Sequence, residues 1–109
     1  MKPKKLKRAV IKEELVELTG DYKSAILLQY LMTCSEHSYS AWICKKAEEL
    51  SSETMLNMSP ESIRKYLKKL INKGFLSERK NTEYKWDRIM QYKVNFVKIQ
   101  EELNNLGIL

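Results

Sequence analysis

Residues 59–76, SPESIRKYLKKLINKGFL, carry the start and stop signals of one helix, and this segment constrains the fold more than any other. Ser59 is a good N-cap, and Pro60 suits the first helical position, where its missing N–H leaves no hydrogen bond unmade. Gly74 favours the left-handed backbone conformation that ends many helices. The sequence therefore predicts a helix over Pro60–Lys73.

Drawn at about 100° per residue, this predicted helix has two different faces. One arc is apolar and contains Ile63, Tyr66, Leu67, Leu70 and Ile71. The opposite arc is mainly basic and polar and contains Glu61, Ser62, Arg64, Lys65, Lys68, Lys69 and Asn72. We expect the apolar arc to pack on the core. The basic arc suits a helix in a DNA major groove, because cations bind phosphates and short polar groups near the helix start can reach base edges.

After Gly74 the apolar period changes from that of a helix to that of a strand. Phe75–Lys80 and Arg88–Phe96 are predicted strands, and Asn81–Asp87 joins them as a hairpin. In the second strand, one face is predicted to carry Met90, Tyr92, Val94 and Phe96. The bases near the hairpin tip are Arg79, Lys80, Lys85 and Arg88. A helix followed directly by a basic hairpin is typical of a winged helix-turn-helix, whose wing contacts flanking phosphates or the minor groove.

The rest of the chain predicts mainly helices. Tyr22–Glu36 is apolar almost all round, which indicates a buried helix at the centre of the core. The other expected elements are a helix over Glu13–Thr19 ending at Gly20, a strand over Ala41–Cys44, a helix over Lys45–Thr54 and a helix over Phe96–Leu106. The predicted fold class is therefore mainly α with a small β-hairpin wing, a winged helix-turn-helix with an added C-terminal helix. Its expected parts are a flexible basic arm (1–9), the winged domain (10–96) and the C-terminal helix (97–109).

The predicted last helix carries one apolar stripe, made of Phe96, Ile99, Leu103 and Leu106. Such a stripe forms a seam against one other helix, either in this chain's own core or in a second protomer of a homodimer. The seam is shorter than two heptads, which favours packing within the chain.

Charge is distributed unevenly along the 109 residues, which carry a formal net charge of +6. Residues 1–12 hold six Lys or Arg and no acid, and residues 54–93 hold ten Lys or Arg against four Asp or Glu. Residues 13–53 are acidic, with three bases and eight acids. This asymmetry favours one polyanion-binding face over a generally basic surface.

Other features exclude several classes of function. The chain has no phosphate-binding GxxxxGK[ST] loop, no GxGxxG motif and only one histidine, His37. Cys34 and Cys44 have no second pair and are expected to be reduced thiols of a cytoplasmic protein. We therefore expect no enzymatic activity, no catalytic residues, no metal and no cofactor. No stretch of 18 apolar residues exists, so we also expect no membrane partner.

Several motifs together resemble a known family. The buried helix carries Ala25-Ile26-Leu27-Leu28-Gln29-Tyr30, and the strand region carries Trp42-Ile43 followed by Glu48-Glu49. The basic helix matches at Ser59, Ser62, Ile63, Arg64, Lys65, Leu67, Lys68, Leu70, Lys73 and Gly74. The hairpin matches at Lys85, Asp87, Arg88, Tyr92, Val94 and Asn95, with Ile89 where the family has Thr. From about residue 10 to 96 the chain resembles the N-terminal winged-helix domain of DnaD-like replication initiators (replisome organisers) of Gram-positive phages and plasmids.

We therefore expect double-stranded DNA binding, and the resemblance implies a role in replication initiation with replication proteins as further partners. The expected recognition-helix contacts are Ser59, Ser62, Arg64, Lys65, Lys68 and Lys69. The expected wing contacts are Arg79, Lys80, Lys85 and Arg88. Two alternatives stay open: a winged-helix transcriptional regulator, and a winged helix that binds proteins and not DNA. The acidic block 13–53 supports the second alternative, because it would repel DNA wherever DNA approached it.

Overall fold

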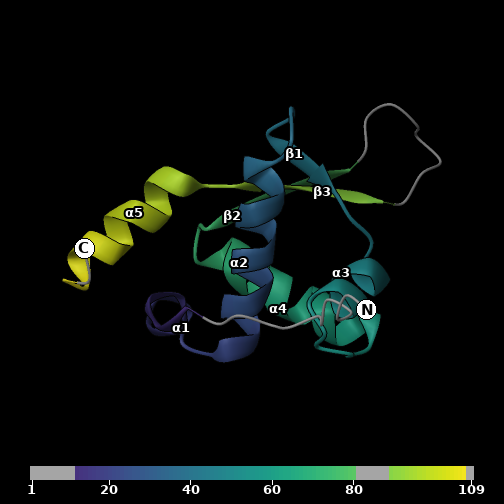
Figure 1. The fold of residues 1–109 in the computed structure, drawn as a ribbon, viewed down its shortest axis with the longest axis horizontal. Helices are drawn as coiled ribbons and strands as arrows, with labels where there is room; N and C mark the ends of the chain where they lie inside the picture. The colour runs from purple at the N-terminus through teal and green to yellow at the C-terminus, as the bar shows by residue number, and fades with distance from the viewer. Residues whose placement is uncertain (1–11, 81–88, 108–109) are drawn as a thin grey trace, which may run out of the picture.

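The computed structural model describes residues 12–80 and 89–107, and these form helices around a small sheet (Figure 1). The helices are α1 (Glu13–Thr19), α2 (Tyr22–Glu36), α3 (Ala47–Glu53), α4 (Pro60–Asn72) and α5 (Phe96–Asn105). The strands are β1 (Trp42–Cys44), β2 (Leu76–Lys80) and β3 (Met90–Val94). The predicted mainly helical class with a small antiparallel β element is confirmed. The predicted arm and hairpin tip lie outside the described residues, as do Lys85 and Arg88.

Helix α2 runs through the centre of the molecule, as its composition predicts (Figure 1). Leu27, Leu28 and Leu31 have no exposed surface and form the middle of the core. The helix begins at Asp21, whose carboxylate accepts a hydrogen bond of 2.7 Å from the Ser24 backbone N–H. This side-chain cap satisfies one of the N–H groups that a helix start leaves without an intrahelical partner.

The three strands form an antiparallel sheet in the order β1-β3-β2. Ile43 of β1 lies opposite Tyr92 of β3, and both side chains are buried on the face towards the helices. The next pair, Trp42 opposite Lys93, belongs to the other face, because successive side chains of a strand point to opposite sides. The sheet therefore has one core face and one outer face.

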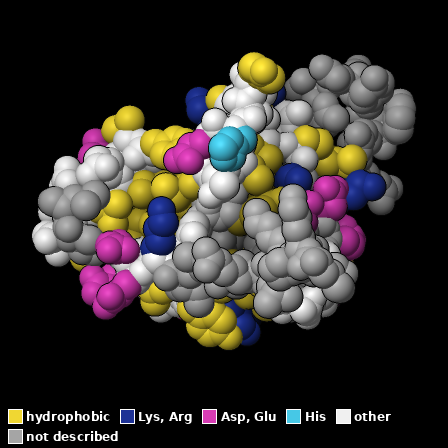
Figure 2. All heavy atoms as spheres, viewed as in Figure 1, with side chains coloured by type: hydrophobic (Ala, Val, Ile, Leu, Met, Phe, Trp, Pro, Cys, Tyr) yellow, Lys and Arg dark blue, Asp and Glu magenta, His cyan; other side chains and the backbone are white. Residues whose placement is uncertain are grey.

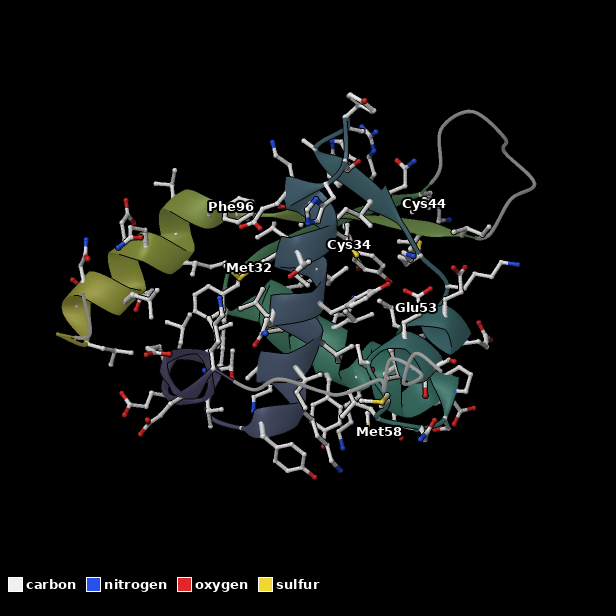
Figure 3. The ribbon with its side chains drawn as sticks, viewed as in Figure 1. Met32, Cys34, Cys44, Glu53, Met58 and Phe96 are labelled. Atoms are coloured by element: carbon white, nitrogen blue, oxygen red, sulfur yellow. The ribbon has the colours of Figure 1, made fainter. Side chains whose placement is uncertain are left out.

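Strand β3 is shorter than the predicted Arg88–Phe96, and one part of that prediction is wrong. Phe96 does not share the core face of the strand; it is the first residue of α5 and is 41% exposed (Figure 3). The hydrogen bonds of Asn95 explain why the strand ends before Phe96 and the helix begins there. Its backbone N–H donates to the Phe75 carbonyl at 2.9 Å, and its side-chain amide donates to the Gly74 carbonyl at 2.8 Å. These bonds attach the end of β3 to the turn that follows α4 and end the extended backbone there.

Helix α4 has the bounds that its local signals predict, within one residue. Ser59 caps it by accepting from the Ser62 backbone N–H at 3.2 Å, and Gly74 beyond its C-cap has the left-handed φ of +85°. Ile63, Leu67 and Leu70 are buried, whereas Tyr66 and Ile71 are half-buried at the edges of the apolar arc. The residues at helical spacing thus anchor α4 and leave its other face open.

Helix α5 packs on its own chain through Ile99 and Leu103, both buried, and it lies beside α1. Leu106, the last residue of the predicted stripe, is 51% exposed. Among the described residues, the central part of the stripe therefore faces this chain's own core. No helix in these ranges is long and apolar enough to cross a membrane.

Candidate nucleic-acid interface

The side of α4 opposite the core carries the basic residues that the sequence places there. Arg64, Lys65 and Lys68 are exposed, and Lys69 is half-buried. The same open surface continues over Asn72 and Lys73. This is the exposed face of the helix, which presents four cations within two turns. The face of the molecule that Figure 2 shows has no such basic cluster, because its Lys and Arg side chains are scattered among Asp and Glu side chains.

Two of the four cations have carboxylate partners. The Nζ atom of Lys68 lies 3.2 Å from Oε1 of Glu78 on β2. Lys69 donates to the carboxylate of Asp21, the N-cap of α2. The lysine side chains are 64% and 41% exposed, and exposed pairs of this kind contribute only about 0–1 kcal/mol. A phosphate group could therefore compete with either carboxylate.

The Asp21 carboxyl responds to this pairing. Partial burial alone would raise its pKa, but the hydrogen bonds from Lys69 and Ser24 lower it, and the net pKa lies below the usual 3.8. Asp21 is therefore ionised at neutral pH and places a negative charge beside the basic face. Nothing in the local sequence signals this pair, because the two residues are 48 positions apart.

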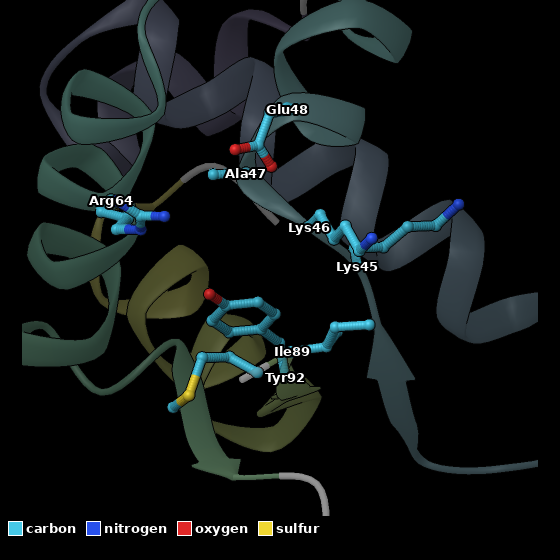
Figure 4. A pocket seen from close by; sticks show the side chains of 8 residues that line it. Lys45, Lys46, Ala47, Glu48, Arg64, Ile89 and Tyr92 are labelled. Atoms are coloured by element: carbon cyan, nitrogen blue, oxygen red, sulfur yellow. The ribbon is translucent and has the colours of Figure 1, made fainter. Parts of the chain in front are cut away.

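Arg64 and Lys65 form no ion pair with any residue in 12–80 or 89–107. Lys65 projects from the open face of α4. Arg64 lies at the edge of a hollow of about 310 Å³ between α3, α4 and β3 (Figure 4). The hollow is lined by Lys45, Lys46, Ala47, Glu48, Arg64, Ile89, Met90 and Tyr92.

The two described cations of the predicted wing point to opposite sides of the sheet. Lys80 is two residues from Glu78, whose carboxylate reaches α4, so alternation places Lys80 on the α4 side. Arg79 lies on the outer face. Its guanidinium is 4.2 Å from the centroid of the Trp42 ring, and its Nε donates to Oε1 of Gln91 at 2.7 Å. Arg79 therefore has intramolecular partners on the side away from α4.

The predicted serine contacts have a structural role. Ser59 caps α4 through its oxygen, and its hydroxyl donates to Oγ of Ser62 at 3.0 Å. Two residues that sequence reasoning missed also lie near the basic face. Lys23 of α2 lies 5.8 Å from the Tyr66 ring, and Tyr92 points its hydroxyl into the hollow beside Arg64 (Figure 4). The strand pattern marks Tyr92 as buried, but it gives no sign of where the hydroxyl lies.

Comparison of the chain with protein-family models, with curated proteins and with solved structures found no match.

Within the described residues, no group of three or more His, Cys, Asp and Glu side chains could hold a metal ion. Cys34 is half-buried on α2, and burial raises the pKa of its thiol (Figure 3). A thiol with a raised pKa is a poor nucleophile at neutral pH. The basic residues of the candidate interface lie on α4 and β2.

Proposed function

We propose that this protein binds double-stranded DNA as a winged helix, with α4 in the major groove and the β2–β3 hairpin beside it. The observation that carries the proposal is the exposed basic face of α4, formed by Arg64, Lys65, Lys68 and Lys69. Helices in the major groove use such cations to neutralise phosphates and to contact guanine edges. Lys80 lies on the same side of the sheet as this face and adds a wing contact.

The arrangement of the elements supports the same proposal. The order α2, β1, α3, α4, β2, β3, with β3 in the middle of the sheet, is compatible with a winged helix-turn-helix. In such a domain α4 would be the recognition helix and the β2–β3 connection the wing. We keep Lys85 and Arg88 in the proposed interface because their sequence positions place them near the tip of the predicted hairpin. Arg79 leaves it, because Trp42 and Gln91 hold its side chain on the outer face.

The biological role that we propose is replication initiation of the phage or plasmid type, in the cytoplasm, with replication proteins as further partners. It rests on the family resemblance of the sequence motifs. A transcriptional regulator would use the same DNA-binding face and differ in its target site. Selection of bound duplexes from a random library separates the two roles: repeated direct sites favour an origin, and a single two-fold site favours an operator.

A titration with random-sequence duplex at several salt concentrations tests the DNA-binding proposal. If about six phosphates are neutralised, the logarithm of the association constant should fall with the logarithm of salt at a slope of roughly −5. Changing Arg64 and Lys68 together to Ala should weaken binding by roughly 2–6 kcal/mol at about 1–3 kcal/mol per contact, without unfolding the protein. Absent or salt-insensitive binding would refute the proposal and leave the protein-binding alternative.

A further inference from the structure

The hollow between α3, α4 and β3 lies between the basic face of α4 and the sheet. Its volume of about 310 Å³ is roughly ten times the ~30 Å³ share of one water molecule, so it can admit a small polar group together with water. Arg64 approaches it from α4, Glu48 from α3 and Tyr92 from β3 (Figure 4). Three elements that are separate in sequence therefore contribute polar side chains to one space.

Tyr92 is the unusual group in this hollow. Its side chain is only 5% exposed, and the ring packs in the core opposite Ile43. The Tyr92 hydroxyl forms no hydrogen bond with another described residue, and its oxygen is accessible from the hollow, because no described buried side-chain oxygen lacks a partner. The hydroxyl points into the hollow towards Arg64 (Figure 4). The hollow therefore contains an available donor fixed by its own buried ring.

The charges around the hollow favour an anion. Lys46 and Arg64 line it without an ion-pair partner in the described ranges, whereas Lys45 is bound to Glu53 at 3.3 Å. Glu48 is the single carboxylate in the lining. Burial, with a smaller effect of Glu78, raises the pKa of Tyr92, although Arg64 opposes this. The hydroxyl therefore stays protonated at neutral pH and can donate a hydrogen bond.

We propose that this hollow binds one backbone phosphate of the DNA duplex, with the Tyr92 hydroxyl donating to a phosphate oxygen and Arg64 supplying the charge. The proposal rests on the proposed function, and it adds a contact that the basic face of α4 alone does not imply. A phosphate oxygen accepts hydrogen bonds, and bonds to charged groups are roughly twice as strong as neutral ones. Because the ring is buried, the hydroxyl loses little side-chain freedom when it binds.

Tyr92→Phe is the decisive variant, since it removes the hydroxyl and leaves the charge and the ring in place. We expect its duplex affinity to fall about ten- to a hundredfold, the effect of one hydrogen bond to a charged group, with the salt slope unchanged. Arg64→Ala should reduce the steepness of that slope by about one. Tyr39→Phe is the matched control, because Tyr39 is fully exposed before β1, and it should bind like the unchanged protein.

A titration with inorganic phosphate, followed by NMR amide shifts at constant ionic strength, tests the hollow without DNA. Phosphate should shift Ala47, Arg64 and Tyr92 where chloride does not, and the shifts should weaken in Tyr92→Phe. If the protein binds duplex and Tyr92→Phe binds equally well, this inference is wrong and the proposed function stands. If duplex binding is absent but the phosphate shifts appear, the hollow is an anion site and its assignment to DNA is overturned. Absence of both signals overturns both proposals.

Discussion

The ammonium group of Lys69 on α4 donates a hydrogen bond to the carboxylate of Asp21, the residue that caps α2. The same carboxylate accepts from the backbone N–H and the hydroxyl of Ser24. One acidic side chain therefore stabilises the start of the central helix and pairs with a cation of the proposed interface. This arrangement links the stability of the fold to the electrostatics of the basic face, and two predictions depend on it.

The first concerns the pH dependence of stability in Asp21→Asn. The carboxyl has a lowered pKa in the folded protein, so its stabilising effect is fully present above the unfolded value near 3.8 and is lost as pH falls through the folded value. Asn keeps an oxygen that can cap α2 but cannot pair with Lys69 as an anion. The stability difference from the unchanged protein should therefore shrink between about pH 5 and pH 2 in urea unfolding experiments.

Asp21→Ala provides the comparison, because it removes the cap together with the charge. It should be less stable than Asp21→Asn by roughly 1 kcal/mol at neutral pH, the usual effect of losing an N-cap. A difference between Asp21→Asn and the unchanged protein that stays constant down to acidic pH would contradict the proposed ion-pair contribution.

The second prediction concerns DNA affinity. Asp21→Asn and Glu78→Gln each remove a carboxylate that forms an ion pair with a lysine of α4. Each variant should bind duplex more tightly, by roughly 0.5–1 kcal/mol at low salt, because a competing negative charge is lost beside the phosphates. Glu101→Gln is the control: it also removes one negative charge, but on α5 and away from the basic face of α4, and it should change duplex affinity much less. Fluorescence anisotropy with one duplex is sufficient, and weaker binding by both α4-side variants would exclude the proposed face.

A third prediction separates the open face of α4 from the outer face of the sheet. Lys65→Ala and Arg79→Ala each remove one cation near β2 or α4, but only Lys65 lies on the proposed interface. Lys65→Ala should weaken duplex binding by about 1 kcal/mol and reduce the steepness of the salt slope by about one. Arg79→Ala should leave affinity nearly unchanged and lower stability by roughly 0.5–1 kcal/mol, because Trp42 loses its cation–π partner at an exposed site.

Duplex affinity and unfolding stability are measured for both variants. Equal losses of affinity would show that the outer face of the sheet also contacts DNA. A large loss of affinity in Arg79→Ala with none in Lys65→Ala would place the DNA interface on the outer face and contradict the proposal.

Local signals explain what the sequence could predict. Ser59, Pro60 and Gly74 mark the ends of α4, and the composition of α2 predicts its burial, because caps and hydrophobic periodicity depend on neighbours in sequence. The β2–β3 pairing follows in the same way from the change of period. These signals act within one element. The exposed side of α4 could therefore be predicted, because it depends only on where the apolar residues of that helix lie around its axis.

The contacts between elements could not be predicted in this way. A helical projection gives the angle of Lys68 or Lys69 around its own axis, but not the carboxylate that another element brings to it. The position of Arg79 depends on the register of three strands, which places it beside Trp42. Phe96 continues the alternating pattern of β3, yet the tertiary hydrogen bonds of Asn95 turn the chain into a helix there.

The last prediction tests the junction at Asn95. Its side-chain amide donates to the Gly74 carbonyl at 2.8 Å and contacts Oγ of Ser77 at 3.3 Å, so it joins the turn after α4 to the start of α5. Asn95→Ala should destabilise the protein by about 1–2 kcal/mol, because a half-buried carbonyl loses its donor. Asn104→Ala, which removes only an exposed bond to Gln100 on α5, should cost less than about 0.5 kcal/mol. Thermal or urea unfolding distinguishes the two, and equal effects would show that the Asn95 bonds do not hold this junction.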